Sequence, residues 1–317
     1  MSLNSLSSRH RHTPPPPWHP KLWPSWFILG VLRLAVRLPL SAQAALGRAG
    51  GRLAWRFAKG RRAIAQRNVE LCFPELDKHS QQQLVKENFV QLGMGAMESA
   101  WSWLGAKHLA TDYLNRFTVE GYENYTRARA QNRGVIVLGV HLMSLDVIGP
   151  ALLAEQMQLN VIYRYNKNPV IEKAIKEGRE RFYPKVIERE DTRAIITALK
   201  SGEAIWYAAD QDYGKRHSLF PTFFGVSAAT ITATMRLAKL CDSPVLLLSH
   251  YRAKDGQSWR IHLSPVLQDF PSADPLADTQ RVNDLLEAAI RVAPEQYLWP
   301  HRRFKTRPAG EQSLYGS

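Results

Sequence analysis

A histidine and a carboxylate stand five residues apart at the end of an apolar run, in the segment VIVLGVHLMSLDVIG (residues 135–149). They are His141 and Asp146. A neutral imidazole can remove a proton from an alcohol, and a carboxylate on its other ring nitrogen fixes the tautomer and stabilises the imidazolium. The pair therefore predicts general-base activation of a hydroxyl group, with His141 as the base and Asp146 as its acid.

The spacing alone leaves a structural alternative open. On one regular helix, five residues turn about 140° beyond a full circle, so the two side chains would diverge. They can meet only if His141 lies in the turn after a strand and Asp146 lies in the first turn of the following helix. Otherwise His141 is a packed core histidine and Asp146 is an acid at a helix start.

Other catalytic signatures are missing from the sequence. The chain has no G-x-S-x-G, G-x-G-x-x-G, Walker loop, H-E-x-x-H or C-x-x-C sequence. Two cysteines, Cys72 and Cys241, are too few for a disulfide framework. A base without an obvious covalent nucleophile suits direct transfer from an activated donor, such as a thioester, to a hydroxyl group. No cofactor and no metal are expected.

Strands and helices are expected to alternate from residue 134 onward. Expected strands cover residues 134–140, 160–164, 204–209, 245–251 and 259–264. Expected helices cover residues 79–104, 145–156, 169–182, 192–200, 228–240 and 278–292. This alternation predicts one α/β domain over residues 68–310, with a mixed, mostly parallel sheet flanked by helices. Ligands of such sheets bind at the carboxyl ends of the strands, where His141 is expected.

The first 67 residues carry the excess positive charge. They contain twelve of the 42 Lys and Arg residues and no Asp or Glu, and the net charge of the chain is +14. Residues 1–20 are rich in Ser, His and Pro, which predicts a disordered lead. Residues 22–40 are apolar except for two arginines, and basic residues follow up to residue 67. We therefore predict a membrane-anchoring helix and a basic juxtamembrane segment over residues 21–67, spanning the bilayer or lying in its interface; the alternative is an amphipathic core helix.

Four sequence blocks stand in the order found in a known family. They are RNVELCFPE (67–75), GVHLMSLD (139–146), IWYAADQDYG (205–214) and QYLWPHRRFKTRP (296–308). Together they resemble the LpxL/HtrB-type lipid A biosynthesis acyltransferases, which include lauroyl and palmitoleoyl transferases. The resemblance runs from about residue 20 to residue 310. The His-x4-Asp block is also similar to that of the glycerol-phosphate acyltransferases, which implies a fold of that type.

The resemblance implies a membrane-bound enzyme on the cytoplasmic side of the bacterial inner membrane. Such an enzyme takes a fatty acyl group from acyl carrier protein. It transfers the group to the hydroxyl of a 3-hydroxyacyl chain on the Kdo-bearing lipid A precursor, late in lipopolysaccharide biosynthesis. The implied partners are acyl carrier protein, the lipid A precursor and membrane lipid, and no nucleic acid is expected.

The resemblance also implies roles for single residues. His141 occupies the position of the catalytic base and Asp146 that of the acid, where many members of the lauroyl branch have Glu. Arg179 and Asp210 match an important arginine and aspartate of the family and are expected to bind substrate. Arg164 ends an expected strand and is a further substrate-binding candidate, because arginine binds phosphates and carboxylates in a bidentate manner.

Two other polar groups carry open interpretations. Asp210 and Asp212 form a D-x-D sequence that could hold a divalent cation, orient an arginine or a loop, or end a plain turn; we favour the second interpretation. The basic HRRFKTRP segment is either solvated or in contact with acceptor phosphates. An apolar groove is expected for the acyl chain, although core packing explains its candidate residues equally well. These candidates are Trp101, Trp103, Phe223 and Phe224.

Three rival functions remain open from the sequence. They are acylation of another membrane lipid such as a glycerol phosphate or a glycolipid, metal-dependent glycosyl transfer, and a basic membrane-tethered binding protein without activity. Beyond residue 67 the chain carries thirty Lys and Arg against twenty-eight Asp and Glu. This near-neutral balance argues against a nucleic-acid-binding domain, which would present a dense basic face.

Overall fold

The computed structural model of the protein describes residues 15–105 and 111–316. Of the disordered lead predicted over residues 1–20, residues 1–14 therefore lie outside the described residues. The chain then enters a short 3-10 helix, η1 (Pro20–Leu22).

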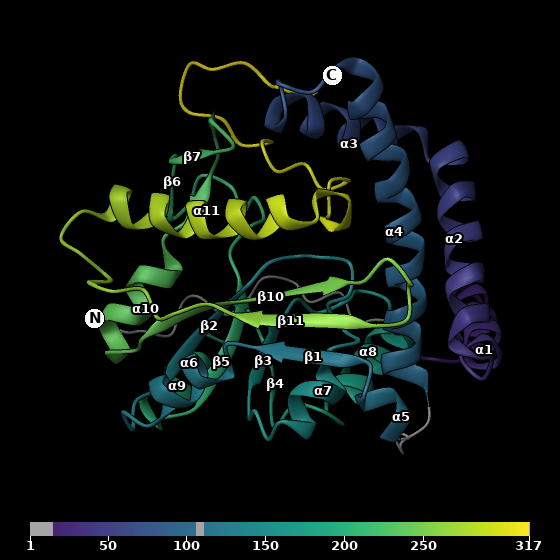
Figure 1. The fold of residues 1–317 in the computed structure, drawn as a ribbon, viewed down its shortest axis with the longest axis horizontal. Helices are drawn as coiled ribbons and strands as arrows, with labels where there is room; N and C mark the ends of the chain where they lie inside the picture. Colours follow the sequence, from purple (N-terminus) through teal and green to yellow (C-terminus); the bar gives the residue numbers. More distant parts are fainter. Residues whose placement is uncertain (1–14, 106–110, 317) are drawn as a thin grey trace.

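A seven-stranded sheet forms the centre of the molecule (Figure 1). Its strands are β1 (Phe117–Glu120), β2 (Val135–Gly139), β3 (Asn160–Tyr163), β4 (Val186–Glu188), β5 (Ala204–Ala208), β10 (Val245–Arg252) and β11 (Trp259–Leu263). They lie in the order β1-β11-β10-β2-β5-β3-β4, and every neighbouring pair is parallel except β10 with β11. The prediction of a mixed, mostly parallel sheet is confirmed. Two short pairs follow β5, formed by β6 (Ser218–Leu219) with β9 (Thr230–Ile231) and by β7 (Thr222–Phe223) with β8 (Val226–Ser227).

Helices cover both faces of this sheet. Helix α11 (Pro275–Val292) lies on one face, and α6 (Tyr122–Arg129) and α7 (Gly149–Ala154) lie on the other (Figure 1). Alternate residues of β2 belong to the two core clusters on these faces, as the two-residue period of a strand requires. The remaining helices of the sheet domain are α5 (Thr111–Leu114), α8 (Pro169–Arg179), α9 (Thr192–Lys200) and α10 (Ala233–Cys241), and η2 (Pro294–Gln296) follows α11.

The five predicted strands and the predicted helices are present, with changes at their ends. Helix α9 has the predicted bounds, and its N-cap Asp191 accepts a hydrogen bond from the backbone of Ala194. The helix predicted over residues 145–156 is shorter, because residues 143–148 form turns and α7 begins only at Gly149. The helix predicted over residues 228–240 begins at Ala233, because Thr230–Ile231 pairs as β9.

Four N-terminal helices lie at one side of the sheet (Figure 1). They are α1 (Trp23–Ala35), α2 (Leu40–Phe57), α3 (Lys59–Cys72) and α4 (Lys78–Leu104). The backbones of α2 and α4 touch, since a Cβ atom on Gly51 would lie 2.2 Å from the carbonyl oxygen of Phe89. A Cβ atom on Gly93 would lie 2.2 Å from the carbonyl oxygen of Gly47. Only glycine permits an approach this close.

The predicted membrane-anchoring stretch is divided among several elements. Residues 22–40 form the end of η1, the helix α1 and the first residue of α2. Helix α1 has 13 residues. Across residues 15–105 and 111–316, every helix is too short or too polar to cross a bilayer.

Candidate active site

His141 and Asp210 meet at the carboxyl edge of the sheet. Strands β2 and β5 are parallel neighbours that end side by side at Gly139 and Ala208, and each side chain follows its strand by two residues. Oδ1 of Asp210 lies 2.6 Å from Nδ1 of His141, and the backbone N–H of His141 donates to Oδ2 at 2.9 Å. One carboxylate therefore orients both the imidazole ring and the loop that carries it.

The protonation of this pair suits a general base. Burial lowers the pKa of His141, but the charge and hydrogen bond of Asp210 outweigh burial and raise that pKa above its ordinary value. Burial raises the pKa of the fully buried Asp210, but His141 and its hydrogen bonds outweigh this and hold the pKa below its usual range. An ionised Asp210 accepts a hydrogen bond from Nδ1–H, which keeps the proton on Nδ1 and leaves Nε2 as the basic nitrogen. The His141 side chain is 24% exposed, so the ring is accessible.

Asp146 contacts Arg179. Oδ1 of Asp146 accepts a hydrogen bond from Nε of Arg179 at 2.9 Å and lies 2.8 Å from Nη2. The hydroxyl of Ser99 in α4 donates to Oδ2 at 3.1 Å. The carboxylate on the ring of His141 is thus Asp210, whereas the sequence interpretation placed Asp146 there. The difference arises because the turns before α7 direct Asp146 toward α8; its catalytic role stays a prediction.

Asp212 and Arg164 occupy different parts of the same edge. Asp212 accepts hydrogen bonds from the backbone and the hydroxyl of Thr306, at 2.6 and 2.9 Å. The D-x-D sequence is therefore divided, with Asp210 turned to the His141 loop and Asp212 to the C-terminal segment. In the part of the chain that the structure describes, no three His, Cys, Asp or Glu side chains are grouped to hold a metal. Arg164 follows β3, with β5 between it and β2, and its side chain is exposed.

The basic C-terminal block is largely packed into the protein. Arg303 is 1% exposed and donates to the carbonyl oxygen of Ala229 and the hydroxyl of Thr230. Burial lowers the pKa of His301 to about 4, so this ring is neutral at physiological pH. The block therefore presents fewer cations to a ligand than its sequence indicates.

The four aromatic groove candidates have different surroundings. Phe223 and Phe224 belong to the buried core, where Phe224 packs against Phe73 with ring centroids 5.2 Å apart. Trp101 stacks on Tyr113 at 4.1 Å and lines an apolar crevice between α2, α4 and β11. Other residues that line this crevice are Leu40, Met94, Met97, Val147 and Trp259. Trp103 packs against Gly178 of α8.

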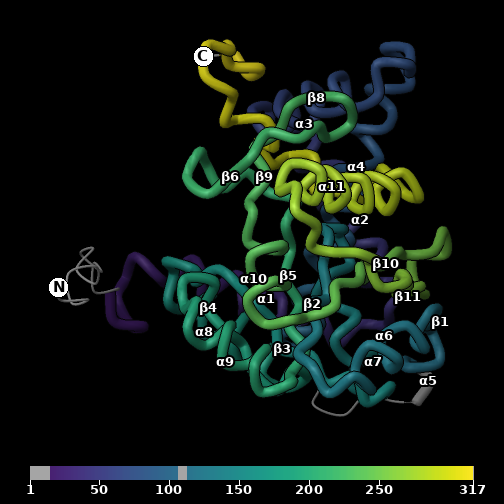
Figure 2. Tube along the Cα trace, turned by 90° about the vertical axis from the view of Figure 1, so that its left-hand side faces the viewer, coloured from purple at the N-terminus to yellow at the C-terminus, as the bar shows by residue number. Residues whose placement is uncertain are grey.

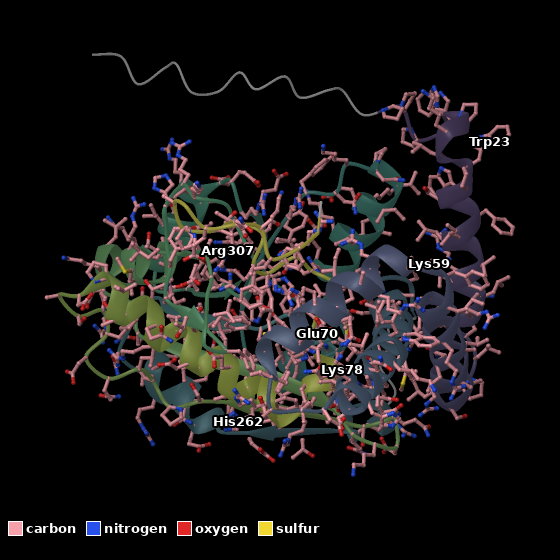
Figure 3. All side chains as sticks on the ribbon, turned by 90° about the horizontal axis from the view of Figure 1, so that it is seen from above. Trp23, Lys59, Glu70, Lys78, His262 and Arg307 are labelled. Atoms are coloured by element: carbon pink, nitrogen blue, oxygen red, sulfur yellow. The ribbon has the colours of Figure 1, made fainter. Side chains whose placement is uncertain are left out.

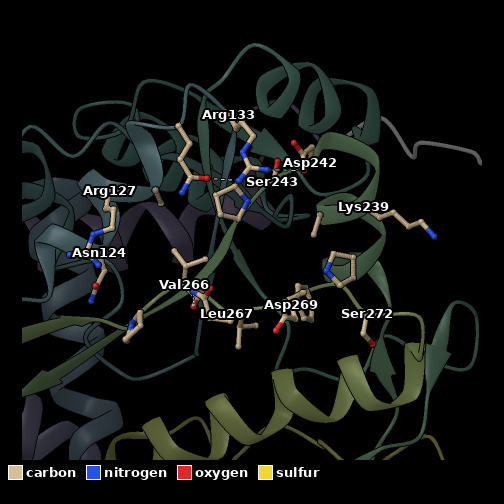
Figure 4. A pocket seen from close by; sticks show the side chains of 18 of the residues that line it. Asn124, Arg127, Arg133, Lys239, Asp242, Ser243, Val266, Leu267, Asp269 and Ser272 are labelled. Carbon is tan, nitrogen blue, oxygen red and sulfur yellow. Dashed lines mark hydrogen bonds and ion pairs between the residues drawn. The ribbon is translucent and has the colours of Figure 1, made fainter.

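A larger cavity lies at the opposite edge of the sheet (Figure 4). It has a volume of about 770 Å³ and lies beside Arg133 and Pro244, which precede β2 and β10. Arg127 and Lys239 also line it, and Arg133 forms an ion pair with Asp242 at 2.8 Å. Because the length of β2 separates this cavity from His141, the cavity is no part of the site described above.

Comparison with known proteins decides the family. The sequence profile of the family described as bacterial lipid A biosynthesis acyltransferase matches residues 15–306. The chain belongs to this family. A lipid A biosynthesis palmitoleoyltransferase of Escherichia coli (strain K12) is 40% identical over 298 residues, which cover 94% of this chain and 96% of the relative. A lauroyltransferase of the same strain is 38% identical over 301 residues, with the same coverage.

A more distant relative is a lipid A biosynthesis myristoyltransferase of the same strain, 29% identical over 302 residues that cover 94% of this chain and 91% of the relative. The resemblance seen in the four sequence blocks is thereby confirmed. The protein is an acyltransferase of lipid A biosynthesis.

Proposed function

We propose that this acyltransferase moves a fatty acyl group from acyl carrier protein to the hydroxyl of a 3-hydroxyacyl chain on the Kdo-bearing lipid A precursor. His141 is the general base in this proposal. The observation that carries it is the partly exposed imidazole whose Nδ1 is bonded to a buried, ionised Asp210. The relatives named as lipid A biosynthesis palmitoleoyl and lauroyl transferases support a fatty acyl group as the transferred group and a lipid A precursor as the acceptor.

The reaction requires one proton to move twice. Nε2 of His141 removes the proton of the acceptor hydroxyl as the hydroxyl oxygen attacks the thioester carbon, and the thioester oxygen becomes an oxyanion. The tetrahedral intermediate then collapses to the ester, and the departing thiolate takes the proton from the imidazolium of His141. Asp210 stabilises the imidazolium between these steps. Arg179, held by Asp146, supplies a partly buried cation for the developing negative charge.

The two substrates would reach His141 from different sides. The proposed role of the exposed Arg164 is to bind a phosphate or sugar carboxylate of the acceptor. The apolar crevice lined by Trp101 and Met97 includes Val147, which is next to Asp146, and is the proposed path of the acyl chain; its volume is about 20 Å³, so its side chains must move apart to admit the chain.

Helices α1 and α2 are proposed to lie in the membrane interface. Trp23 lies on the outside of α1 (Figure 3), and large apolar side chains remain exposed along both helices. They include Trp23, Phe27, Leu34, Leu53 and Phe57, which are 60 to 74% exposed. Exposed cations accompany them, namely Arg33, Arg37, Arg52, Arg56 and Lys59. Apolar side chains next to cations fit the headgroup boundary of an anionic bilayer, here the cytoplasmic side of the bacterial inner membrane.

Mass spectrometry of lipid A tests the proposal. Cells that lack the gene should lose one secondary acyl chain, and the mass difference should return when the gene is supplied. Purified protein should acylate the Kdo-bearing precursor from acyl carrier protein, and His141→Ala should lower the rate by about 10²- to 10⁴-fold while its circular dichroism stays unchanged. Acylation of a glycerol phosphate without acylation of the precursor would show that the proposed acceptor is wrong.

A further inference from the structure

A segment near the C-terminus, Glu295 to Thr306, begins in η2 and continues through a series of turns. It connects the N-terminal helices with both loops of the site, and we call it the strap. Figure 2 shows the C-terminal residues lying beside α3. Two buried asparagines hold one edge of the strap, Asn88 of α4 and Asn68 of α3. Each donates from Nδ2 to two alternate carbonyl oxygens, at 2.6 to 2.8 Å. The four carbonyls belong to Glu295, Tyr297, Trp299 and His301.

The opposite edge of the strap holds the His141 loop. The backbone N–H of Leu298 donates to the carbonyl oxygen of His141 at 3.1 Å, and the N–H of Met143 donates to the carbonyl oxygen of Gln296 at 2.8 Å. Between them, Leu142 forms an antiparallel bridge with Tyr297. The loop is therefore paired with the strap as one strand pairs with another.

The strap also fixes the Asp210 loop. The hydroxyl of Tyr297 donates to the carbonyl oxygen of Asp210 at 3.2 Å. Further along the strap, the backbone N–H and the hydroxyl of Thr306 donate to the two carboxylate oxygens of Asp212, at 2.6 and 2.9 Å. The two loops that meet in the 2.6 Å contact of His141 with Asp210 are thus attached to one common backbone segment.

We propose that the strap positions His141 and Asp210 for acyl transfer, and that Asn68, Asn88, Asp212 and Thr306 are positioning residues for the reaction. The inference rests on the proposed role of His141 as the base. A shift of about 1 Å in a reacting group lowers a rate by as much as 10²-fold, and removal of a group that orients another commonly costs 10- to 100-fold. None of the four residues has to touch a substrate to have this effect.

Two variants test the strap. Asn88→Ala removes two hydrogen bonds to the strap, and Thr306→Val removes the hydroxyl contact with Asp212 at constant size. Asn160→Ala is the matched control, because Asn160 is a buried asparagine at the amino end of β3, opposite to the strand ends that carry the site, and its side chain is bonded to Glu203. Thr306→Ser restores the hydroxyl. Transfer is measured for each protein against pH and acceptor concentration, below its unfolding temperature.

Asn88→Ala and Thr306→Val should each lower kcat about 10- to 100-fold with KM unchanged. The acid limb of the pH–rate profile should move to lower pH, because a loosened Asp210 raises the pKa of His141 less. Asn160→Ala should lose thermal stability but keep the parental kcat and profile, and Thr306→Ser should resemble the parent. All these proteins keep the charged and titratable groups that act on His141, namely Asp210, Asp146, Arg179, His250 and His301.

Parental kcat and pH profile in both strap variants would overturn the inference. If Asn88→Ala does not fold, the comparison of Thr306→Val with Thr306→Ser decides alone. His141→Ala, measured in the same assay, separates the two proposals. If His141→Ala is active, the proposal that His141 is the base is wrong. If His141→Ala is inactive while both strap variants are fully active, only the proposed role of the strap is wrong.

Discussion

Replacement of Asp210 by asparagine distinguishes the two acids that could serve His141. Asparagine has the shape of aspartate but only one acceptor oxygen, whereas Asp210 accepts hydrogen bonds from both Nδ1 and the backbone N–H of His141. If the amide nitrogen faces Nδ1, the ring must carry its proton on Nε2 and cannot act as a base. If the nitrogen faces the backbone N–H, two donors oppose each other and the loop must move.

The expected loss is large for Asp210→Asn and smaller for Asp146→Asn. A catalytic histidine in the wrong tautomer loses about 10⁴-fold in kcat in the serine protease triad, or about 5 kcal/mol of transition-state stabilisation. Asp146→Asn leaves the contact of Asp210 with His141 intact; it weakens the support of Arg179 and removes a charge that contributes less than Asp210 to the raised pKa of His141. Loss of one group that stabilises an oxyanion costs about 10²- to 10³-fold. Asp210→Asn should therefore be slower than Asp146→Asn by at least about tenfold.

The assay measures transfer from acyl carrier protein by both purified variants across a range of pH. Because Asp210 raises the pKa of His141, the residual activity of Asp210→Asn should have its acid limb at lower pH than that of the parent. KM should change little in either variant, since neither acid is placed in the acyl crevice. A greater loss in Asp146→Asn than in Asp210→Asn would refute the reasoning and return the role of acid partner to Asp146.

Three further predictions concern stability and pH. Gly51→Ala should lower the unfolding temperature, because the added Cβ would meet the α4 backbone. The control Gly50→Ala, whose added Cβ would have nothing within 4 Å, should raise the free energy of unfolding by up to about 1 kcal/mol. Equal effects of the two variants in thermal unfolding would contradict the close contact of α2 and α4. Burial lowers the pKa of His250 to about 3, so acidification from pH 7 to pH 5 should cost roughly 2 kcal/mol through this residue, because only the unfolded state takes up the proton. In urea unfolding, His250→Leu should reduce the pH dependence of the free energy of unfolding. An unchanged pH dependence would contradict the lowered pKa of His250 in the folded state. Glu98→Gln should lower the free energy of unfolding by about 3 kcal/mol in urea, because it leaves the buried Arg252 without the carboxylate that lies 2.7 Å from its Nη2. A loss below about 1 kcal/mol would contradict this prediction.

The strand that leads to His141 was predictable from sequence, but the partner of His141 was not. A β-branched apolar run bounded by glycine is a local signal, and β2 ends within one residue of its predicted bounds. The contact with Asp210 depends on the order of strands, because β5 is the spatial neighbour of β2 although β3 and β4 come between them in the sequence. No periodicity along the chain carries that order, so the nearer acid, Asp146, was assigned to the ring.

Ser99 and the two asparagines that bind the strap, Asn68 and Asn88, were missed for a related reason. They lie on helices far from the site in sequence, and each contacts it through a single side chain. Two of the four family blocks, RNVELCFPE and QYLWPHRRFKTRP, do meet in the structure, through Asn68 and the strap. Their separate positions in the sequence gave no sign that they would be joined by hydrogen bonds.

Because Gly47, Gly51 and Gly93 bring α2 and α4 into direct backbone contact, the exposed apolar side chains of α2 cannot pivot independently of α4. Helix α4 in turn holds the strap through Asn88 and Asp146 through Ser99. If α2 binds a bilayer as proposed, α2, α4 and the His141 loop therefore move on it as one rigid unit. On that proposal, any change in how α2 sits in the bilayer would also move His141, so the way α2 is seated would influence which acceptor hydroxyl reaches the base.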